Sequence, residues 1–276
     1  MLVPVQKSGS RPPLFFVHGQ HGVMPLGRFF AGVLASNQPL YVIHANGIDG
    51  RQSPIDDFRT MVLAYVEEIQ ETCPRGPIRI GGLCQGSLVA LEITRELRTA
   101  GRETDPVILV DPNTVFHRLP EMKHIRQGQR PDVRHPLVRG QLYQQVRMVL
   151  SDYGSRPYND LPFDCADPEQ LHVASLAGLA CVFALAAYTP TPYPGPVAVI
   201  VSKERAARFF HPELPWHRLL VGPRKIQVLP WEHGQMLQEG REDLARLIKI
   251  FVDKASNFQI EADQKRIVRG LEAPSG

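Results

Sequence analysis

The fold is decided by one stretch, Ile78–Leu88, which reads IRIGGLCQGSL. Its order, an apolar run, then Gly-x-Cys-x-Gly, then a helical pattern, predicts the strand-turn-helix called a nucleophile elbow, with Cys84 at the turn. Gly82 and Gly86 would let strand and helix approach closely. A helix N-terminus lowers the pKa of a thiol, so Cys84 is the candidate nucleophile and the backbone N–H of Gln85 a candidate oxyanion donor. The alternative is a buried structural cysteine in a glycine-rich turn.

Further apolar runs flank this stretch on both sides: Leu14–Val17, Leu40–His44, Val107–Val110, Val197–Val201 and Ile226–Leu229. Several are rich in Val and Ile without polar alternation, which is typical of strands buried on both faces of a parallel sheet. Between them lie helical patterns, one of which we expect to begin at Ser53-Pro54 and to end before Pro74. The sequence therefore predicts an α/β fold, with a mostly parallel central sheet and helices on both faces.

The 276 residues suit one such domain over residues 1–255, followed by a polar tail over residues 256–276. Residues 112–196 interrupt the alternation of strands and helices. They hold a stretch rich in Pro, Arg and His, then two helical patterns, and a closing run of alternating prolines. An insertion of this kind between two strands predicts a helical lid over the sheet.

Composition excludes several classes of protein. A net charge of +3 gives no nucleic-acid or membrane-surface signal. The four cysteines have no metal-site spacing and are too few for a disulfide scaffold, so we expect a cytoplasmic protein without a metal or bound cofactor. Leu171–Tyr188 is about as long and apolar as a minimal membrane span. Its His172, Ser175 and Gly178 favour a buried or cleft-lining helix.

A second glycine loop follows the first of these runs and reads FVHGQHG from Phe16 to Gly22. In hydrolases with a nucleophile elbow, the other oxyanion amide comes from such a loop, and we assign it to the backbone N–H of Gln20. An ordinary glycine-rich turn is the alternative. His18 and His21 are less favoured as bases, because they lie in the loop that would shape the oxyanion hole.

The general base is expected after the last strand, where His233 stands before the final helix. Two acids follow earlier strands, Asp111 and Glu204. Asp111 is favoured because its short side chain follows its strand immediately, a position suited to holding an imidazole. Glu204 stays open, because hydrolases of this kind commonly place the acid after the later strand.

These residues together resemble the thioesterase domains of polyketide and nonribosomal peptide synthetases, which have the α/β-hydrolase fold. The resemblance covers most of the chain and is carried by six segments: Leu2–Gln6, Pro12–Gly19, Gln38–Tyr41, Asn46–Gly50, Gly81–Ser87 and Glu232-His233. It implies that the acid is Asp111 and that residues 112–196 are the lid. Two positions depart from the family pattern. Cys84 stands where the family usually has Ser, as a natural or an engineered residue, and Ser87 replaces a glycine after the elbow.

The resemblance also implies the substrate. It would be an acyl or peptidyl chain held as a thioester on the phosphopantetheine arm of a carrier protein. A cysteine nucleophile would exchange one thioester for another, so the acyl-enzyme would keep its activation. Release by cyclisation or amine transfer then becomes an expected outcome beside hydrolysis.

Two other functions compete with this reading. One is a stand-alone cysteine hydrolase of the dienelactone-hydrolase kind, acting on a small lactone. Such enzymes lack a long helical lid at this point and place the acid after the later strand. The other is a non-catalytic module that binds carrier proteins. The set Cys84, Asp111 and His233 argues against that module.

Overall fold

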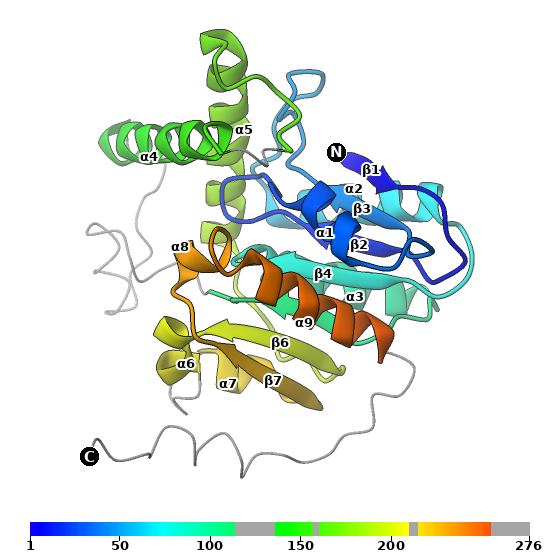
Figure 1. Ribbon diagram of the computed structural model, residues 1–276. Helices are drawn as coiled ribbons and strands as arrows, with labels where there is room; N and C mark the ends of the chain where they lie inside the picture. Colours follow the sequence, from blue (N-terminus) through cyan, green and yellow to red (C-terminus); the bar gives the residue numbers. More distant parts are fainter. Residues whose placement is uncertain (114–135, 157–159, 210–214, 255–276) are drawn as a thin grey trace, which may run out of the picture.

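A seven-stranded sheet forms the centre of the protein (Figure 1). The computed structural model describes residues 1–113, 136–156, 160–209 and 215–254. The strand order is β1-β3-β2-β4-β5-β6-β7. The strands are β1 (Leu2–Gln6), β2 (Leu14–Val17), β3 (Leu40–Ile43), β4 (Arg79–Leu83), β5 (Val107–Val110), β6 (Val197–Ser202) and β7 (Arg224–Leu229). All neighbours are parallel except β1, which pairs antiparallel with β3.

Helices cover both faces of the sheet, as the sequence predicted. The helices are α1 (Gly27–Val33), α2 (Phe58–Thr72), α3 (Gly86–Thr99), α4 (Pro136–Gly154), α5 (Pro168–Ala187), α6 (Lys203–Phe209), α7 (Pro215–Leu219), α8 (His233–Met236) and α9 (Arg241–Asp253). In Figure 1, α1 and α9 lie in front of the sheet, and α2 and α3 lie behind it. Each face has its own apolar core, one built with α1 and α9 and the other with α2, α3 and α5. This is the α/β-hydrolase arrangement.

The apolar runs of the sequence correspond to six of the strands, β2 to β7. β1 was not predicted, because it is half exposed at the edge of the sheet and lacks a buried apolar run. The expected helix start at Ser53 was wrong. Helix α2 begins at Phe58, where the Asp57 carboxylate accepts hydrogen bonds from the amide and hydroxyl of Thr60 at 2.8 and 2.7 Å. Asp57 therefore caps the first turn.

Helices α4 and α5 come from the expected insertion, and they pack against each other above the sheet (Figure 1). Among the described helices, only α5 is long and apolar enough to cross a membrane. However, 72% of the 18-residue stretch that meets this criterion is buried inside the protein. The α5 backbone crosses the loop after β2 closely: a Cβ on Gly178 would lie 2.7 Å from the carbonyl oxygen of His21. Residues 114–135 of the insertion, and the predicted tail over 256–276, lie outside the described residues.

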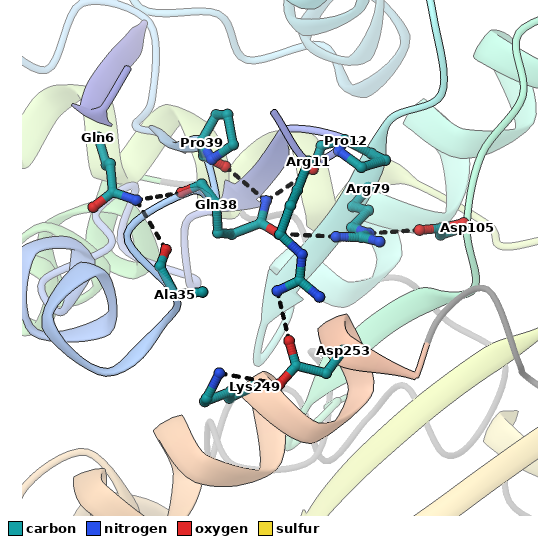
Figure 2. A network of polar contacts seen from close by, with 10 residues as sticks. All are labelled: Gln6, Arg11, Pro12, Ala35, Gln38, Pro39, Arg79, Asp105, Lys249 and Asp253. Carbon is teal, nitrogen blue, oxygen red and sulfur yellow. Dashed lines mark hydrogen bonds and ion pairs between the residues drawn. The ribbon is translucent and has the colours of Figure 1, made fainter. Parts of the chain in front are cut away.

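A polar network fixes the amino ends of the central strands, far from the site described below (Figure 2). Arg79, at the start of β4, donates to Asp105 at 2.5 Å and to the Gln38 side chain at 2.8 Å. Gln38 in turn donates to the carbonyl oxygens of Pro12 and Pro39 at 2.8 and 2.9 Å. Arg79 and Gln38 are buried, so each of these hydrogen bonds replaces one that water would otherwise make.

Candidate active site

The predicted site residues follow the carboxyl ends of neighbouring parallel strands. Cys84 comes directly after β4, Asp111 directly after β5, and His233 begins α8, which follows β7. Because parallel strands end at the same edge of a sheet, these residues meet although they are far apart in the chain. Figure 1 shows α6 and α8 at this edge of the sheet.

Cys84 sits on a strained turn between β4 and α3. Its φ is +53°, in the left-handed region that side chains other than glycine rarely adopt. The turn is so tight that a Cβ on Gly82 would lie 2.3 Å from the carbonyl oxygen of Gly86. A Cβ on Gly86 would lie 1.9 Å from the carbonyl oxygen of His18. The amide of Cys84 donates to the Val110 carbonyl at 2.7 Å, which ties the turn to β5.

Asp111 holds the imidazole of His233. Oδ2 of Asp111 accepts a hydrogen bond from Nδ1 of His233 at 2.5 Å, and Oδ1 accepts one from the amide of Ser202 at 2.8 Å. The Asp111 side chain is fully buried, and its φ of +45° turns it toward the site. The Glu204 carboxylate accepts a hydrogen bond from the backbone amide of His233 at 3.4 Å. The structure therefore brings Asp111, and not Glu204, to the imidazole ring.

The electrostatics of the site favour an ion pair between Cys84 and His233. Burial alone would raise the pKa of the Cys84 thiol, but the His233 imidazolium and the Arg205 guanidinium outweigh it and lower that pKa to about 7. Burial would lower the pKa of His233, yet the Cys84 thiolate and the hydrogen bond to Asp111 raise it to about 9. Between about pH 7 and pH 9 the pair is therefore mainly thiolate and imidazolium.

Arg205 is the residue of this site that the sequence analysis missed. It lies in α6, directly after β6, and its side chain is buried. Nη1 lies 3.6 Å from the sulfur of Cys84 and donates to the carbonyl oxygen of Asp111 at 2.6 Å. The available signal was its place after a parallel strand, beside Glu204, at the same edge as the other residues.

The two residues expected to supply oxyanion amides lie in adjacent loops. The Gln85 side chain donates to the Gln20 side chain at 3.0 Å, which links the turn before α3 to the loop after β2. Within the described part of the chain, neither backbone amide donates a hydrogen bond to another residue. Both amides can thus donate hydrogen bonds to an anionic oxygen of a substrate.

The other two histidines considered as bases are in different surroundings. His18 is buried, with Nε2 2.8 Å from the hydroxyl of Tyr65 and Nδ1 2.7 Å from the carbonyl of Gly19. Burial lowers the pKa of His18 and of His21 to about 4, so both are neutral near pH 7. Among the described residues, no cluster of His, Cys, Asp and Glu is arranged to hold a metal ion.

The chain is similar in sequence to known thioesterase domains and synthetases. The family model described as "Thioesterase domain" matches residues 12–148. Atromentin synthetase of Tapinella panuoides is 30% identical over 122 residues, which are 44% of this chain and 13% of the relative. Polyketide synthase PksR of Bacillus subtilis is 30% identical over 110 residues, 40% of this chain and 4% of the relative. The chain thus spans a small part of the length of these much larger proteins.

Solved structures show the same fold over nearly the whole chain. The NocB thioesterase domain, in covalent complex with a fluorophosphonate nocardicin G analog, superposes with a TM-score of 0.65. The match covers 90% of this chain and 98% of that one, at 23% identity. Residues 12–148 therefore match the thioesterase-domain family, whose members include domains of nonribosomal peptide and polyketide synthetases.

Proposed function

We propose that the protein is a thioesterase that releases an acyl or peptidyl chain from the phosphopantetheine thioester of a carrier protein. In this proposal Cys84 is the nucleophile, His233 the general acid and base, and Asp111 the residue that orients His233. One observation carries the proposal. Cys84, on a strand-to-helix turn, has a lowered thiol pKa and interacts with the imidazole of His233. The buried carboxylate of Asp111 holds that imidazole at 2.5 Å. The family membership supports the choice of a thioester as substrate.

The first chemical step is thiol exchange. The Cys84 thiolate attacks the thioester carbonyl, and the negative charge that develops on its oxygen meets the backbone amides of Gln20 and Gln85. The bond from the carbonyl carbon to the phosphopantetheine sulfur then breaks. His233, protonated in the resting pair, gives its proton to that sulfur, so a neutral thiol leaves. The product is an acyl chain in thioester linkage to Cys84.

The second step releases the chain. His233 is now neutral and accepts a proton from the incoming water, hydroxyl or amine as that group attacks the acyl-enzyme. The bond from the acyl carbon to the Cys84 sulfur then breaks, and the sulfur leaves as a thiolate, which restores its ion pair with the His233 imidazolium. Thioesters react with amines more readily than oxyesters do, so a cysteine-bound intermediate favours amide formation more than a serine-bound one would. We therefore include cyclisation and amine transfer beside hydrolysis.

The insertion over residues 112–196 is proposed to act as the lid that shapes the acyl pocket. One backbone contact and one electrostatic interaction support this role. Gly178 of α5 packs against the backbone of the loop that carries Gln20. Tyr153 of α4 is near Cys84: burial raises its pKa to about 12, and the thiolate charge contributes to that rise.

The experiment compares wild type with Cys84→Ser and Cys84→Ala on acyl chains loaded on a carrier protein. Free phosphopantetheine thiol and released product are measured, with and without an added amine. We expect turnover by wild type, none by Cys84→Ala, and reduced hydrolysis by Cys84→Ser with a smaller share of amide product. Full activity in Cys84→Ala would refute the mechanism. Binding of the carrier protein without turnover by wild type would instead point to a binding module, and turnover of small lactones alone to a lactone hydrolase.

A further inference from the structure

A buried guanidinium lies between the two anionic groups of the site. Nη1 of Arg205 is 3.6 Å from the sulfur of Cys84, 2.6 Å from the carbonyl oxygen of Asp111 and 3.2 Å from its Oδ2. The Arg205 side chain is 8% exposed and that of Asp111 is 1% exposed. The backbone amide of Arg205 also donates to the hydroxyl of Ser202 at 3.3 Å, which fixes the start of α6 on the end of β6.

The charges at this edge of the sheet balance in pairs. Cys84 interacts with His233 from α8, Arg205 from α6 and Tyr153 from α4. The Asp111 carboxylate at the end of β5 interacts with His233 and Arg205. Glu204 of α6, which is exposed, also acts on Arg205. A thiolate and an imidazolium cancel, which leaves the buried carboxylate of Asp111. Without a second cation that carboxylate would oppose ionisation of the nearby thiol, because like charges in a buried site repel strongly.

We propose that Arg205 is a fourth catalytic residue, which donates an N–H to the Cys84 thiolate while its charge compensates that of Asp111. This inference goes beyond the Cys84, His233 and Asp111 set and rests on Cys84 being the nucleophile. A serine hydroxyl stays protonated until it attacks, so it presents no resting anion for a guanidinium to bind. Arg205 is therefore a residue that a cysteine at this elbow requires and a serine does not.

The charge balance persists through the reaction. When the Cys84 sulfur becomes bonded to the acyl carbon, it loses its negative charge, and His233 loses its positive charge by protonating the departing sulfur. Arg205 and Asp111 then remain as a neutral pair in the acyl-enzyme. Neither the resting enzyme nor the acyl-enzyme therefore has an uncompensated buried charge. Such a charge would be unfavourable, because it is removed from water without a partner.

The test measures the thiol itself rather than turnover. The rate of Cys84 alkylation by iodoacetamide is followed against pH in wild type, Arg205→Gln and Arg205→Lys, with Arg246→Gln on the exposed face of α9 as the control. We expect the wild-type midpoint near pH 7 to rise by about one pH unit in Arg205→Gln, a roughly tenfold change in the acid constant. Arg205→Lys keeps the positive charge but has a single nitrogen as donor. Its alkylation midpoint should therefore lie between those of wild type and Arg205→Gln. Arg246→Gln should match wild type.

A structural role would give a different pattern. If Arg205→Gln and Arg205→Lys lower the melting temperature but keep the wild-type midpoint, the proposal is overturned. Should Arg205→Gln fail to fold, Arg205→Lys decides alone, and an unchanged midpoint in it overturns the proposal.

A second measurement asks whether the role is specific to cysteine. Arg205→Gln is combined with Cys84→Ser, and thioester hydrolysis is compared in the four combinations. Arg205→Gln should reduce kcat/KM at pH 7 by about fivefold when residue 84 is cysteine, because the thiolate fraction falls by that factor, and by much less when it is serine. An equal loss in both backgrounds would contradict the proposal. If wild type releases no acyl chain but its alkylation midpoint still depends on Arg205, the proposed function fails while this inference stands.

Discussion

Oδ2 of Asp111 lies 2.5 Å from Nδ1 of His233, although 122 residues separate them in the chain. The contact exists because β5 and β7 are parallel strands of one sheet, so the residues that follow them share an edge. It fixes which nitrogen of the ring faces Asp111 and leaves the opposite side of the ring for Cys84. The mechanism proposed for this chain depends on that orientation.

Replacement of Asp111 by Asn should therefore impair turnover without unfolding the protein. An amide cannot hold the imidazolium as the carboxylate does, and in a serine triad this exchange lowers kcat by about 10⁴-fold. We expect a loss of about 10² to 10⁴-fold in kcat/KM on an acyl N-acetylcysteamine thioester, with the melting temperature measured in parallel. Glu204→Gln is the matched control and should change kcat/KM by little. A large loss in Glu204→Gln with a small one in Asp111→Asn would move the acid to Glu204.

The pH dependence of kcat/KM should be bell-shaped. The thiol must be ionised, and its pKa is lowered to about 7, so activity should rise as the pH passes through about 7. The imidazole must be protonated to assist the leaving sulfur, and its pKa is raised to about 9, so activity should fall as the pH passes through about 9. These two pKa values describe the coupled Cys84–His233 pair as a whole and not either residue alone. If kcat/KM stayed at its maximum well below pH 7, that result would contradict the ion pair between Cys84 and His233.

The same two groups set a window of stability. The lowered pKa of Cys84 means that its thiolate stabilises the fold at high pH and loses this effect as the pH falls through about 7. The raised pKa of His233 means that its imidazolium stabilises the fold at low pH and loses this effect as the pH rises through about 9. Across the window between these values the two contributions change in opposite directions, so their sum should change little with pH. Urea unfolding across this range, with Cys84→Ala as reference, measures it.

The close approach of the elbow to β2 predicts which glycine cannot be replaced. Gly86→Ala would place a methyl group 1.9 Å from the carbonyl oxygen of His18, so strand and helix would have to separate. We expect a loss of several kcal/mol of stability, in the range of severe overpacking, together with a loss of activity. Gly32→Ala, on α1 with nothing within 4 Å, is the control. It should be neutral or stabilising by up to about 1 kcal/mol. A stable, active Gly86→Ala protein would show that the elbow is not as tight as described.

Much of this fold follows from sequence because strands buried on both faces leave a continuous apolar signal. The nucleophile elbow was recognisable because its glycines are required by the close approach of strand and helix. Asp111 was recognisable because it follows such a strand, and His233 because it stands between the last strand and the final helix. β1 gave no such signal, since one side of the sheet edge is exposed to solvent. Arg205 could not be assigned, because an arginine after a strand is usually solvated and its burial depends on the packing of α6.

The polar network at the opposite end of the sheet should affect stability and not chemistry (Figure 2). Arg79→Met would leave Asp105 and the buried Gln38 side chain without their donor. We expect a loss of about 3 kcal/mol in unfolding free energy, because breaking a buried ion pair leaves a charge uncompensated. Arg246→Met removes only exposed contacts on α9 and should change stability by less than about 1 kcal/mol. A shifted pH profile in Arg79→Met would show that the two ends of the sheet are coupled.

The central claim, that the acyl chain passes through Cys84, is tested most directly by trapping the intermediate. Wild type and Cys84→Ala are incubated with an acyl N-acetylcysteamine thioester, quenched in acid and digested, and the peptides are mapped by mass spectrometry. The account predicts one acyl adduct in wild type, on the peptide that contains Cys84, removable by hydroxylamine as a thioester is. Cys84→Ala should carry none. An adduct on Ser87 or another residue, or release of acyl chain by Cys84→Ala at the wild-type rate, would contradict the account.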